Sequence, residues 1–320
     1  MHAILRRGAA GLAALAVGIL ALTVCVAVLA WGDSGLVSQP GSSSASQQVD
    51  QPVSLSGTPG GRRHVVVTHD WVIPVGRRYI SVPILMYHYI RTPPSILMDR
   101  LGFDLSVSPA DFSRQMDWLA GHGYHPITLD SLRAYFAGRE ALPIRPVVIT
   151  LDDGYADLYK AAFPILQAHN FKAVAYVVTG FVGQPGYVTR TQVLELAQYG
   201  IEIASHTVNH ADLARTSPPM VMWELIASKK WLQDLVRHAV VDFAYPSGRF
   251  SAQVIAALQT TGYQSAATTM PGTYHSEADR FTWTRVRVHG SESLLIFTQN
   301  LGPVEKAVEI TDIDVVPGFG

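Results

Sequence analysis

Cysteine is almost absent from this sequence, because Cys25 is the only one among 320 residues. A single thiol cannot form an intramolecular disulfide, and it cannot supply a zinc site built from several cysteines. Charged side chains make up only 15% of the residues, and the formal net charge is −1. Because no basic stripe is present, we expect no nucleic-acid partner. We also expect a monomer.

Charge is missing altogether from residues 8–31, an apolar run that follows Arg6 and Arg7. A helix of roughly 20 apolar residues spans a bilayer core, and this run is longer than a signal-peptide core of about 7–15 residues. The arginines favour a short cytoplasmic N-terminus, residues 1–7, with the body outside. We therefore predict a single-pass signal anchor in the cell membrane and an extracytoplasmic body. The alternative is a signal cleaved after Val28-Leu29-Ala30, which would give a secreted protein.

A polar segment follows the apolar run. Residues 32–64 are rich in Ser, Gln, Gly and Pro and contain too little apolar surface to form a core, so we predict a flexible linker. The remainder, residues 65–320, has the composition of one folded domain, and its main motifs lie within residues 80–300.

Short apolar stretches alternate with helix-like segments through this domain. The predicted strands are 82–88, 146–151, 173–178, 201–205, 240–245, 264–268 and 285–289. The predicted helices are 109–120, 156–169, 190–199, 218–238 and 251–261, several of them followed by a glycine that can end a helix. Such alternation is typical of parallel βα units. About seven units indicate an α/β fold with a closed or nearly closed barrel.

Polar side chains gather where several predicted strands end, which is the end of such a barrel that carries chemistry. Asp152 and Asp153 directly follow strand 146–151 and precede Gly154. Adjacent carboxylates repel each other unless a cation or hydrogen-bond donors compensate. A metal ligand with a base beside it explains both acids, and a turn or helix cap is the simpler alternative.

Two histidines follow the strand 201–205. A spacing of four residues would place His206 and His210 on one face of a helical turn. One carboxylate and two imidazoles suit a catalytic zinc with an open position, and the same donors suit other divalent metals. A surface or capping role for the two histidines is the alternative.

These residues resemble the motifs of a known family. Thr150-Leu151-Asp152-Asp153-Gly154 is similar to the T-F-D-D-G motif of the polysaccharide deacetylases, the NodB-homology carbohydrate esterases of family 4. His206-Thr207-Val208-Asn209-His210 matches their H-[ST]-x-x-H motif, and Tyr245-Pro246-Ser247-Gly248 resembles the third motif, R-x-P-Y-G. The resemblance covers about residues 80–300 and implies the distorted (β/α)7 barrel of that family.

The resemblance also implies roles. Asp152 would be the general base, and Asp153, His206 and His210 would hold the metal. A metal-activated water would attack the acetamide carbonyl of an N-acetylated sugar, with a backbone N–H at Ser247 stabilising the oxyanion.

Further contacts with the substrate are assigned to three residues, Tyr245, Pro246 and Trp283. Tyr245 and Pro246 belong to the third motif, and Trp283 lies near the last predicted strand, where it could line a sugar groove.

Two departures from the family pattern change which residues are assigned as the general acid and as the arginine beside the base. Ala244 stands where the third motif has its arginine, and the usual late Leu-x-His motif is not evident. The early strand ends in Met86-Tyr87-His88, which is similar to the subgroup that contains the poly-β-1,6-N-acetylglucosamine deacetylases. By that resemblance His88 is the general acid, with His289 as the alternative, and Arg285 replaces the missing arginine beside Asp152.

The predicted function is metal-dependent N-deacetylation of an extracellular or cell-wall polysaccharide, with an acetylated polysaccharide or oligosaccharide as the partner. An O-acetyl esterase of the xylan type could use the same site. A non-catalytic glycan-binding domain on the same fold is the alternative from a different class, and the missing arginine is the feature in its favour.

Overall fold

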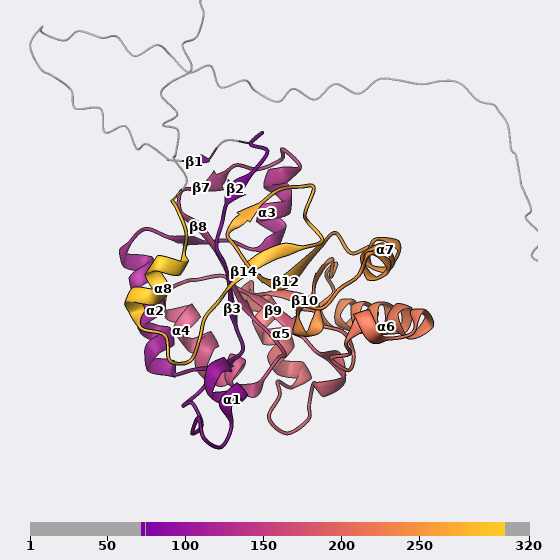
Figure 1. Ribbon diagram of the computed structural model, residues 1–320, viewed down its shortest axis with the longest axis horizontal. Helices are drawn as coiled ribbons and strands as arrows, with labels where there is room; N and C mark the ends of the chain where they lie inside the picture. Colours follow the sequence, from indigo (N-terminus) through magenta and orange to yellow (C-terminus); the bar gives the residue numbers. More distant parts are fainter. Residues whose placement is uncertain (1–71, 74, 305–320) are drawn as a thin grey trace, which may run out of the picture. The chain divides into compact units, whose positions relative to one another are not determined.

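The computed structural model describes residues 72–73 and 75–304 (Figure 1). The predicted N-terminal segments, 1–7, 8–31 and 32–64, lie outside the described residues. Within the described part of the chain, no helix is both long and apolar enough to cross a membrane.

Seven parallel strands form a closed barrel at the centre of the described domain. In order around the barrel they are β3 (Ile84–Tyr87), β8 (Pro146–Leu151), β9 (Val174–Val177), β10 (Glu202–Ser205), β11 (Asp242–Ala244), β12 (Ser265–Pro271) and β14 (Trp283–Arg287). Pairing of β3 with both β8 and β14 closes the ring. Each predicted strand overlaps one of these, so the predicted barrel is confirmed. The barrel strands are largely buried, which is why they appear in the sequence as short apolar runs.

Helices surround the barrel (Figure 1). Those that match predicted segments are α2 (Pro109–Gly121), the π-turn η1 (Leu158–Ala162) leading into α4 (Phe163–Ala168), α5 (Arg190–Tyr199), α6 (Pro218–Val236) and α7 (Ala252–Thr260). Three shorter helices were not predicted: α1 (Arg100–Leu105), α3 (Leu129–Phe136) and α8 (Leu294–Asn300). Local capping explains the sharp boundaries. Ser108 caps α2 through the Asp111 N–H, and Gly200 ends α5 with φ of 103°.

Short elements complete the fold outside the barrel. The two-residue strands are β1 (Val72–Ile73) with β7 (Leu142–Pro143), β2 (Ile80–Ser81) with β13 (Tyr274–His275), β4 (Tyr89–Ile90) with β5 (Ser106–Val107), and β6 (His125–Pro126) beside the start of β8. The 3-10 turns are η2 (Thr179–Phe181), η3 (Leu213–Arg215) and η4 (Pro246–Gly248).

The core has an inner and an outer part because successive strand residues point to opposite faces. Along β8, Val147 and Ile149 belong to the cluster that packs against the helices, whereas Val148 belongs to the cluster inside the barrel. Trp283 of β14 lies in the inner cluster and is fully buried. The predicted role of Trp283 in lining a sugar groove is therefore wrong, because its ring fills the barrel interior.

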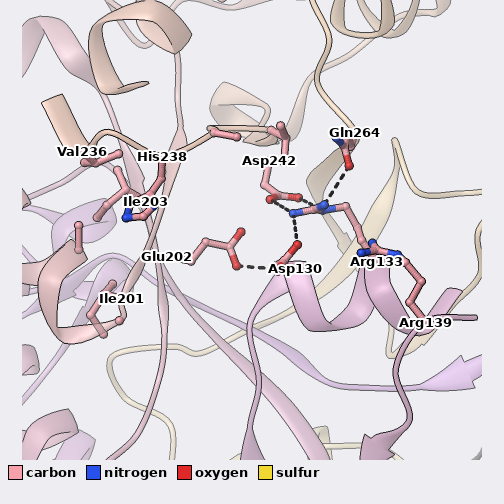
Figure 2. Close-up of a pocket in the computed structure, with 14 residues that line it drawn as sticks. Asp130, Arg133, Arg139, Ile201, Glu202, Ile203, Val236, His238, Asp242 and Gln264 are labelled. Atoms are coloured by element: carbon pink, nitrogen blue, oxygen red, sulfur yellow. Dashed lines mark hydrogen bonds and ion pairs between the residues drawn. The ribbon is translucent and has the colours of Figure 1, made fainter. Parts of the chain in front are cut away.

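A charged cavity lies at the end of the barrel where the strands begin (Figure 2). Its volume is about 530 Å³. Arg133 of α3 binds Asp242 in a bidentate pair, with both nitrogen–oxygen distances at 2.9 Å. Glu202 lies beside this pair, and its Oε2 accepts a 3.2 Å hydrogen bond from the Asp130 N–H. Burial raises the pKa of Glu202 well above its usual value, and the neighbouring Asp242 carboxylate raises it further.

Glu202→Gln is therefore expected to stabilise the protein at neutral pH. A folded-state pKa that is raised for an acid means that stability falls as pH rises above the unfolded value of about 4.3. The glutamine amide can donate to Asp242 without a proton being taken up. Thermal unfolding at pH 7.5 should show a gain of roughly 2–4 °C, equivalent to about 1 kcal/mol. The gain should shrink at pH 4.

The exposed Glu140 offers a matched control, since Glu140→Gln makes the same chemical change on the surface. An unfolding temperature that Glu202→Gln lowers at pH 7.5 would contradict the prediction.

Candidate active site

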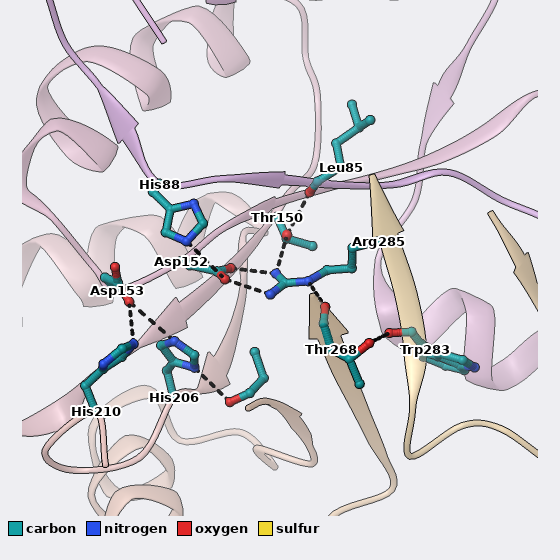
Figure 3. Close-up of polar contacts among 11 residues, drawn as sticks. Leu85, His88, Thr150, Asp152, Asp153, His206, His210, Thr268, Trp283 and Arg285 are labelled. Carbon is teal, nitrogen blue, oxygen red and sulfur yellow. Dashed lines mark hydrogen bonds and ion pairs between the residues drawn. The ribbon is translucent and has the colours of Figure 1, made fainter. Parts of the chain in front are cut away.

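Asp152 and Asp153 diverge at the end of β8. The Asp152 N–H still donates to the Tyr87 carbonyl at 2.9 Å, which continues the pairing with β3. Asp153 and Gly154 then both take left-handed backbone conformations, with φ of 73° and 74°. The resulting turn directs the two carboxylates to different partners, Asp152 to Arg285 and Asp153 to two histidines (Figure 3).

Asp153, His206 and His210 bring three potential metal-ligand atoms together, within 4.8 Å of one another. The Nε2 atoms of His206 and His210 lie 3.3 and 3.4 Å from Asp153 Oδ1. The Asp153 Oδ1 atom is buried, and no hydrogen-bond partner for it is found among the described residues. A buried carboxylate oxygen facing two imidazole nitrogens is a donor set that fits a divalent cation.

The charge states of Asp153 and His210 and the hydrogen bond of His206 agree with metal binding, whereas the Asp153 carboxylate raises the pKa of His206 against its burial. His206 Nδ1 lies 2.7 Å from the Ala244 carbonyl, so it donates its proton there and leaves Nε2 free to bind a metal. Burial alone would raise the pKa of Asp153, but the nearby His206 imidazole, together with His88 and His210, lowers it below its usual value. Burial lowers the pKa of His210. The carboxylate is therefore ionised, and His210 is kept neutral.

Asp152 is held by Arg285 of β14. Two parallel hydrogen bonds join them, from Nη1 to Oδ1 at 2.7 Å and from Nη2 to Oδ2 at 2.8 Å. The Arg285 side chain is 0% exposed, and its remaining donors reach the Thr268 carbonyl at 2.7 Å and Thr150 Oγ1 at 3.1 Å. Burial alone would raise the pKa of Asp152, but the guanidinium lowers it below its usual value. Arg285 thus occupies the position beside Asp152 that the sequence predicts for it.

His88 lies on the other side of Asp152 (Figure 3). Its Nε2 is 3.9 Å from Asp152 Oδ2, and its side chain is 13% exposed. Burial lowers the pKa of His88, against the attraction of the two aspartates. His289 lies elsewhere, with its half-exposed ring 2.8 Å from Asp104. The structure therefore places His88, and not His289, beside the carboxylates.

Comparison with known proteins identifies this arrangement. The family model for polysaccharide deacetylases matches residues 139–266. The Bacillus subtilis (strain 168) protein YxkH, named as a polysaccharide deacetylase, is 32% identical over 208 residues, which are 65% of this chain and 71% of YxkH. The chain belongs to the polysaccharide deacetylase family.

Two further relatives extend the comparison. The Streptococcus pyogenes deacetylase PplD, solved in complex with acetate, has a TM-score of 0.65 and 30% identity, covering 70% of this chain and 99% of PplD. The poly-β-1,6-N-acetyl-D-glucosamine N-deacetylase of Staphylococcus aureus (strain MSSA476) is 26% identical over 171 residues. That match covers 49% of this chain and 59% of the relative.

The third deacetylase motif forms a turn after β11. Ser247 is exposed at this turn with φ of 56°. Tyr245 is 0% exposed, and its hydroxyl donates to the Phe281 carbonyl at 2.9 Å. Pro246 is also buried. The side chains of Tyr245 and Pro246 both pack into the protein, so the predicted contact of these two residues with substrate gains no support from their side chains.

The segment from His206 to His210 is not the helical turn that the spacing suggests. Thr207 and His210 have φ of 69° and 55°, which a right-handed helix excludes. Buried Glu224 of α6 organises the turn instead. Its carboxylate accepts hydrogen bonds from the Val208 N–H at 2.7 Å, the Asn209 N–H at 3.1 Å and the Asn209 side-chain amide at 2.8 Å.

Sequence reasoning missed Glu224. A glutamate among the apolar residues of a predicted helix was the available signal, since a charge is rarely buried without partners. Because the Val208 and Asn209 N–H groups lie between the two histidines, their acceptor Glu224 supports the turn that carries His206 and His210.

Glu224→Gln is expected to weaken metal binding by about 10- to 100-fold. The glutamine has one acceptor oxygen, so its NH₂ group would face either the two backbone N–H groups or the Asn209 side-chain amide, which are all donors. Metal titration with the apoprotein measures the change, and turnover should recover at high metal concentration. Glu140→Gln serves as the surface control. Unchanged metal affinity in Glu224→Gln would show that the turn keeps its shape without the carboxylate.

Proposed function

We propose that this polysaccharide deacetylase is a metal-dependent hydrolase that removes acetyl groups from N-acetylated sugars of an extracellular or cell-wall polysaccharide. One observation supports this most strongly: an Asp153–His206–His210 donor set lies next to a second carboxylate, Asp152, that is held by a buried arginine.

The residues divide the chemistry among them. Asp153, His206 and His210 would hold the divalent metal, with zinc the best match to one carboxylate and two imidazoles. When bound, the metal supplies Lewis acidity and lowers the pKa of a bound water. Asp152 accepts the proton of the attacking water, and Arg285 keeps Asp152 ionised and oriented.

Two groups act on the developing charges. His88 donates a proton to the leaving amine, and its place beside Asp152 lets it receive the proton that Asp152 has taken up. The backbone N–H of Ser247 donates to the oxyanion. A protonated leaving group matters for an amide, because an amine anion is a poor leaving group, and this favours N-deacetylation over ester cleavage.

A relative and the predicted N-terminal anchor support the proposed substrate class. The S. aureus relative acts on poly-β-1,6-N-acetyl-D-glucosamine, according to its name. The predicted signal anchor over residues 8–31 would hold the protein in the cell membrane. The catalytic domain would then lie outside the cell, where such polymers occur.

The test is acetate release from poly-β-1,6-N-acetylglucosamine oligomers, compared with O-acetylated xylan. We expect release from the oligomers, loss of activity after chelation and recovery on adding zinc. Release from xylan alone would replace the proposal with an O-acetyl esterase. Glycan binding with neither metal retention nor acetate release would indicate a binding domain.

A further inference from the structure

A stack of aromatic rings lies beside the active site. Tyr89 and Tyr155 stack face to face, with centroids 3.7 Å apart and planes at 20°. The Arg91 guanidinium lies 3.5 Å from the Tyr89 ring centroid. Tyr187 stacks on Tyr155 at 5.2 Å, and Phe181 contacts Tyr187 at 4.9 Å. These five side chains are called the aromatic stack below.

The aromatic stack joins the segment of the proposed acid to the segment of a proposed metal ligand. Tyr89 directly follows His88, and Tyr155 lies two residues after Asp153. Burial raises the pKa of the Tyr155 hydroxyl, with the Asp153 charge and a hydrogen bond with Tyr89 as further causes.

His88 lies at the point where the chain leaves the barrel. Barrel strand β3 ends at Tyr87 and β4 begins at Tyr89, so His88 is the single residue that connects the two strands. Strand β4 has two residues and pairs with β5 outside the barrel. The stack therefore connects β4 back to the turn after β8, where Asp153 lies.

The Tyr155 end of the stack is itself anchored. Tyr155 forms an antiparallel bridge with Tyr187. The Ala156 N–H donates to the Gly186 carbonyl at 2.8 Å, and the Val188 N–H donates to the Gly154 carbonyl at 3.0 Å. This gives the stack a rigid base next to the proposed metal site.

A sugar-stacking role fits the two central rings poorly. Arg91 and Tyr155 contact the Tyr89 ring, and Tyr89 and Tyr187 contact the Tyr155 ring. Sugars bind aromatic side chains through exposed ring faces, which these contacts cover. Holding two chain segments together is the function that remains for the rings.

We propose that Tyr89 and Tyr155 are positioning residues that hold His88 at the distance from the metal-binding turn at which it can protonate the leaving group. This inference rests on the proposed function, in which His88 is the general acid. It predicts a defect that depends on the leaving group.

The experiment compares two substrates in the full-length protein loaded with zinc. One is an N-acetylglucosamine oligomer, whose amine leaving group needs a proton. The other is 4-nitrophenyl acetate, whose phenolate leaving group does not. Tyr89→Leu and Tyr155→Leu should each lower kcat on the oligomer by about 10- to 100-fold, as expected for a displaced catalytic group. Turnover of the ester and metal content should stay within about twofold of wild type, which is small beside the misplacement effect.

Three variants complete the design. His88→Ala should show the same selective loss, because it removes the acid itself. Tyr89→Phe keeps the ring stack and should restore most of the oligomer rate. Tyr274→Leu removes an exposed tyrosine of β13 and should change neither rate.

Equal losses on both substrates, loss of zinc or no change in Tyr89→Leu would each overturn the inference. If that variant does not fold, Tyr187→Leu tests the outer part of the stack and should give a smaller selective loss; its absence would also overturn the inference. Wild-type protein that releases no acetate from oligomers contradicts the proposed function itself. Active wild type with non-selective variants contradicts only the role of the stack.

Discussion

Replacing Asp152 with asparagine is expected to lower kcat on N-acetylglucosamine oligomers by about 10²- to 10⁴-fold while zinc binding is retained. The change removes the group that accepts the water proton, and it leaves Asp153, His206 and His210 in place. In the wild type, Arg285 Nη1 and Nη2 donate to the two Asp152 oxygens at 2.7 and 2.8 Å. In the variant, the asparagine NH₂ would replace one of these acceptors and face a guanidinium donor. Steady-state kinetics together with metal analysis measures both effects.

Asp234 provides the matched control for this substitution. It is an exposed residue of α6 that pairs with Lys230 at 2.8 Å, so Asp234→Asn makes the same chemical change away from the site. Turnover near the wild-type level in Asp152→Asn would show that the base is another group. Loss of zinc in that variant would show that Asp152 is a ligand.

Replacing Arg285 with glutamine is expected to damage both stability and activity. It would leave the Asp152 carboxylate buried without its cation, and breaking a buried pair in this way typically costs about 3–5 kcal/mol. The substitution removes the charge that lowers the Asp152 pKa, so burial would then raise that pKa. Because the base must be ionised, the acid limb of the kcat/KM profile should move to higher pH.

The pH dependence of stability is an independent measure of the direction in which Arg285 shifts the Asp152 pKa. In the wild type the lowered pKa of Asp152 contributes stability above the unfolded value of about 3.9, and that stability is lost as pH falls through the folded pKa. Arg285→Gln should therefore be most destabilised relative to wild type near neutral pH and less so in acid.

The double variant Asp152→Asn with Arg285→Gln separates pairing from packing. Removing both charges should recover part of the stability lost in Arg285→Gln, because no unpaired buried charge remains. Denaturant unfolding of the four proteins in this cycle measures the coupling. Additive losses would mean that the two side chains contribute independently.

The barrel itself was predictable because the physics of its strands is local. Buried parallel strands produce short apolar runs between amphipathic helices, and all seven predicted runs became barrel strands. The helices that were missed, α1, α3 and α8, are short, with six to eight residues each. Short helices carry little periodicity, and capping contacts such as Thr128 to the Ser131 N–H define their boundaries.

The sequence by itself determined the chemistry available at the strand ends. Asp152, Asp153 and His206 follow barrel strands directly, and His210 lies four residues after His206; parallel strands bring such positions to one end of the barrel. Their approach to one another could therefore be expected from strand order alone. Their resemblance to deacetylase motifs supplied the division into base and ligands, which remains a proposal.

The resemblance to deacetylases predicted Arg285 beside Asp152, but only the tertiary structure decided how the distant side chains reach these residues. Arg285 reaches Asp152 because β14 closes the barrel beside β3, across a separation of 133 residues. Trp283, two residues earlier on the same strand face, is directed into the core for the same reason. Glu224 and the aromatic stack act through contacts between segments that no local pattern relates. The contacts of Arg285 and Trp283 depend on closure of the barrel, which local secondary-structure propensity does not encode.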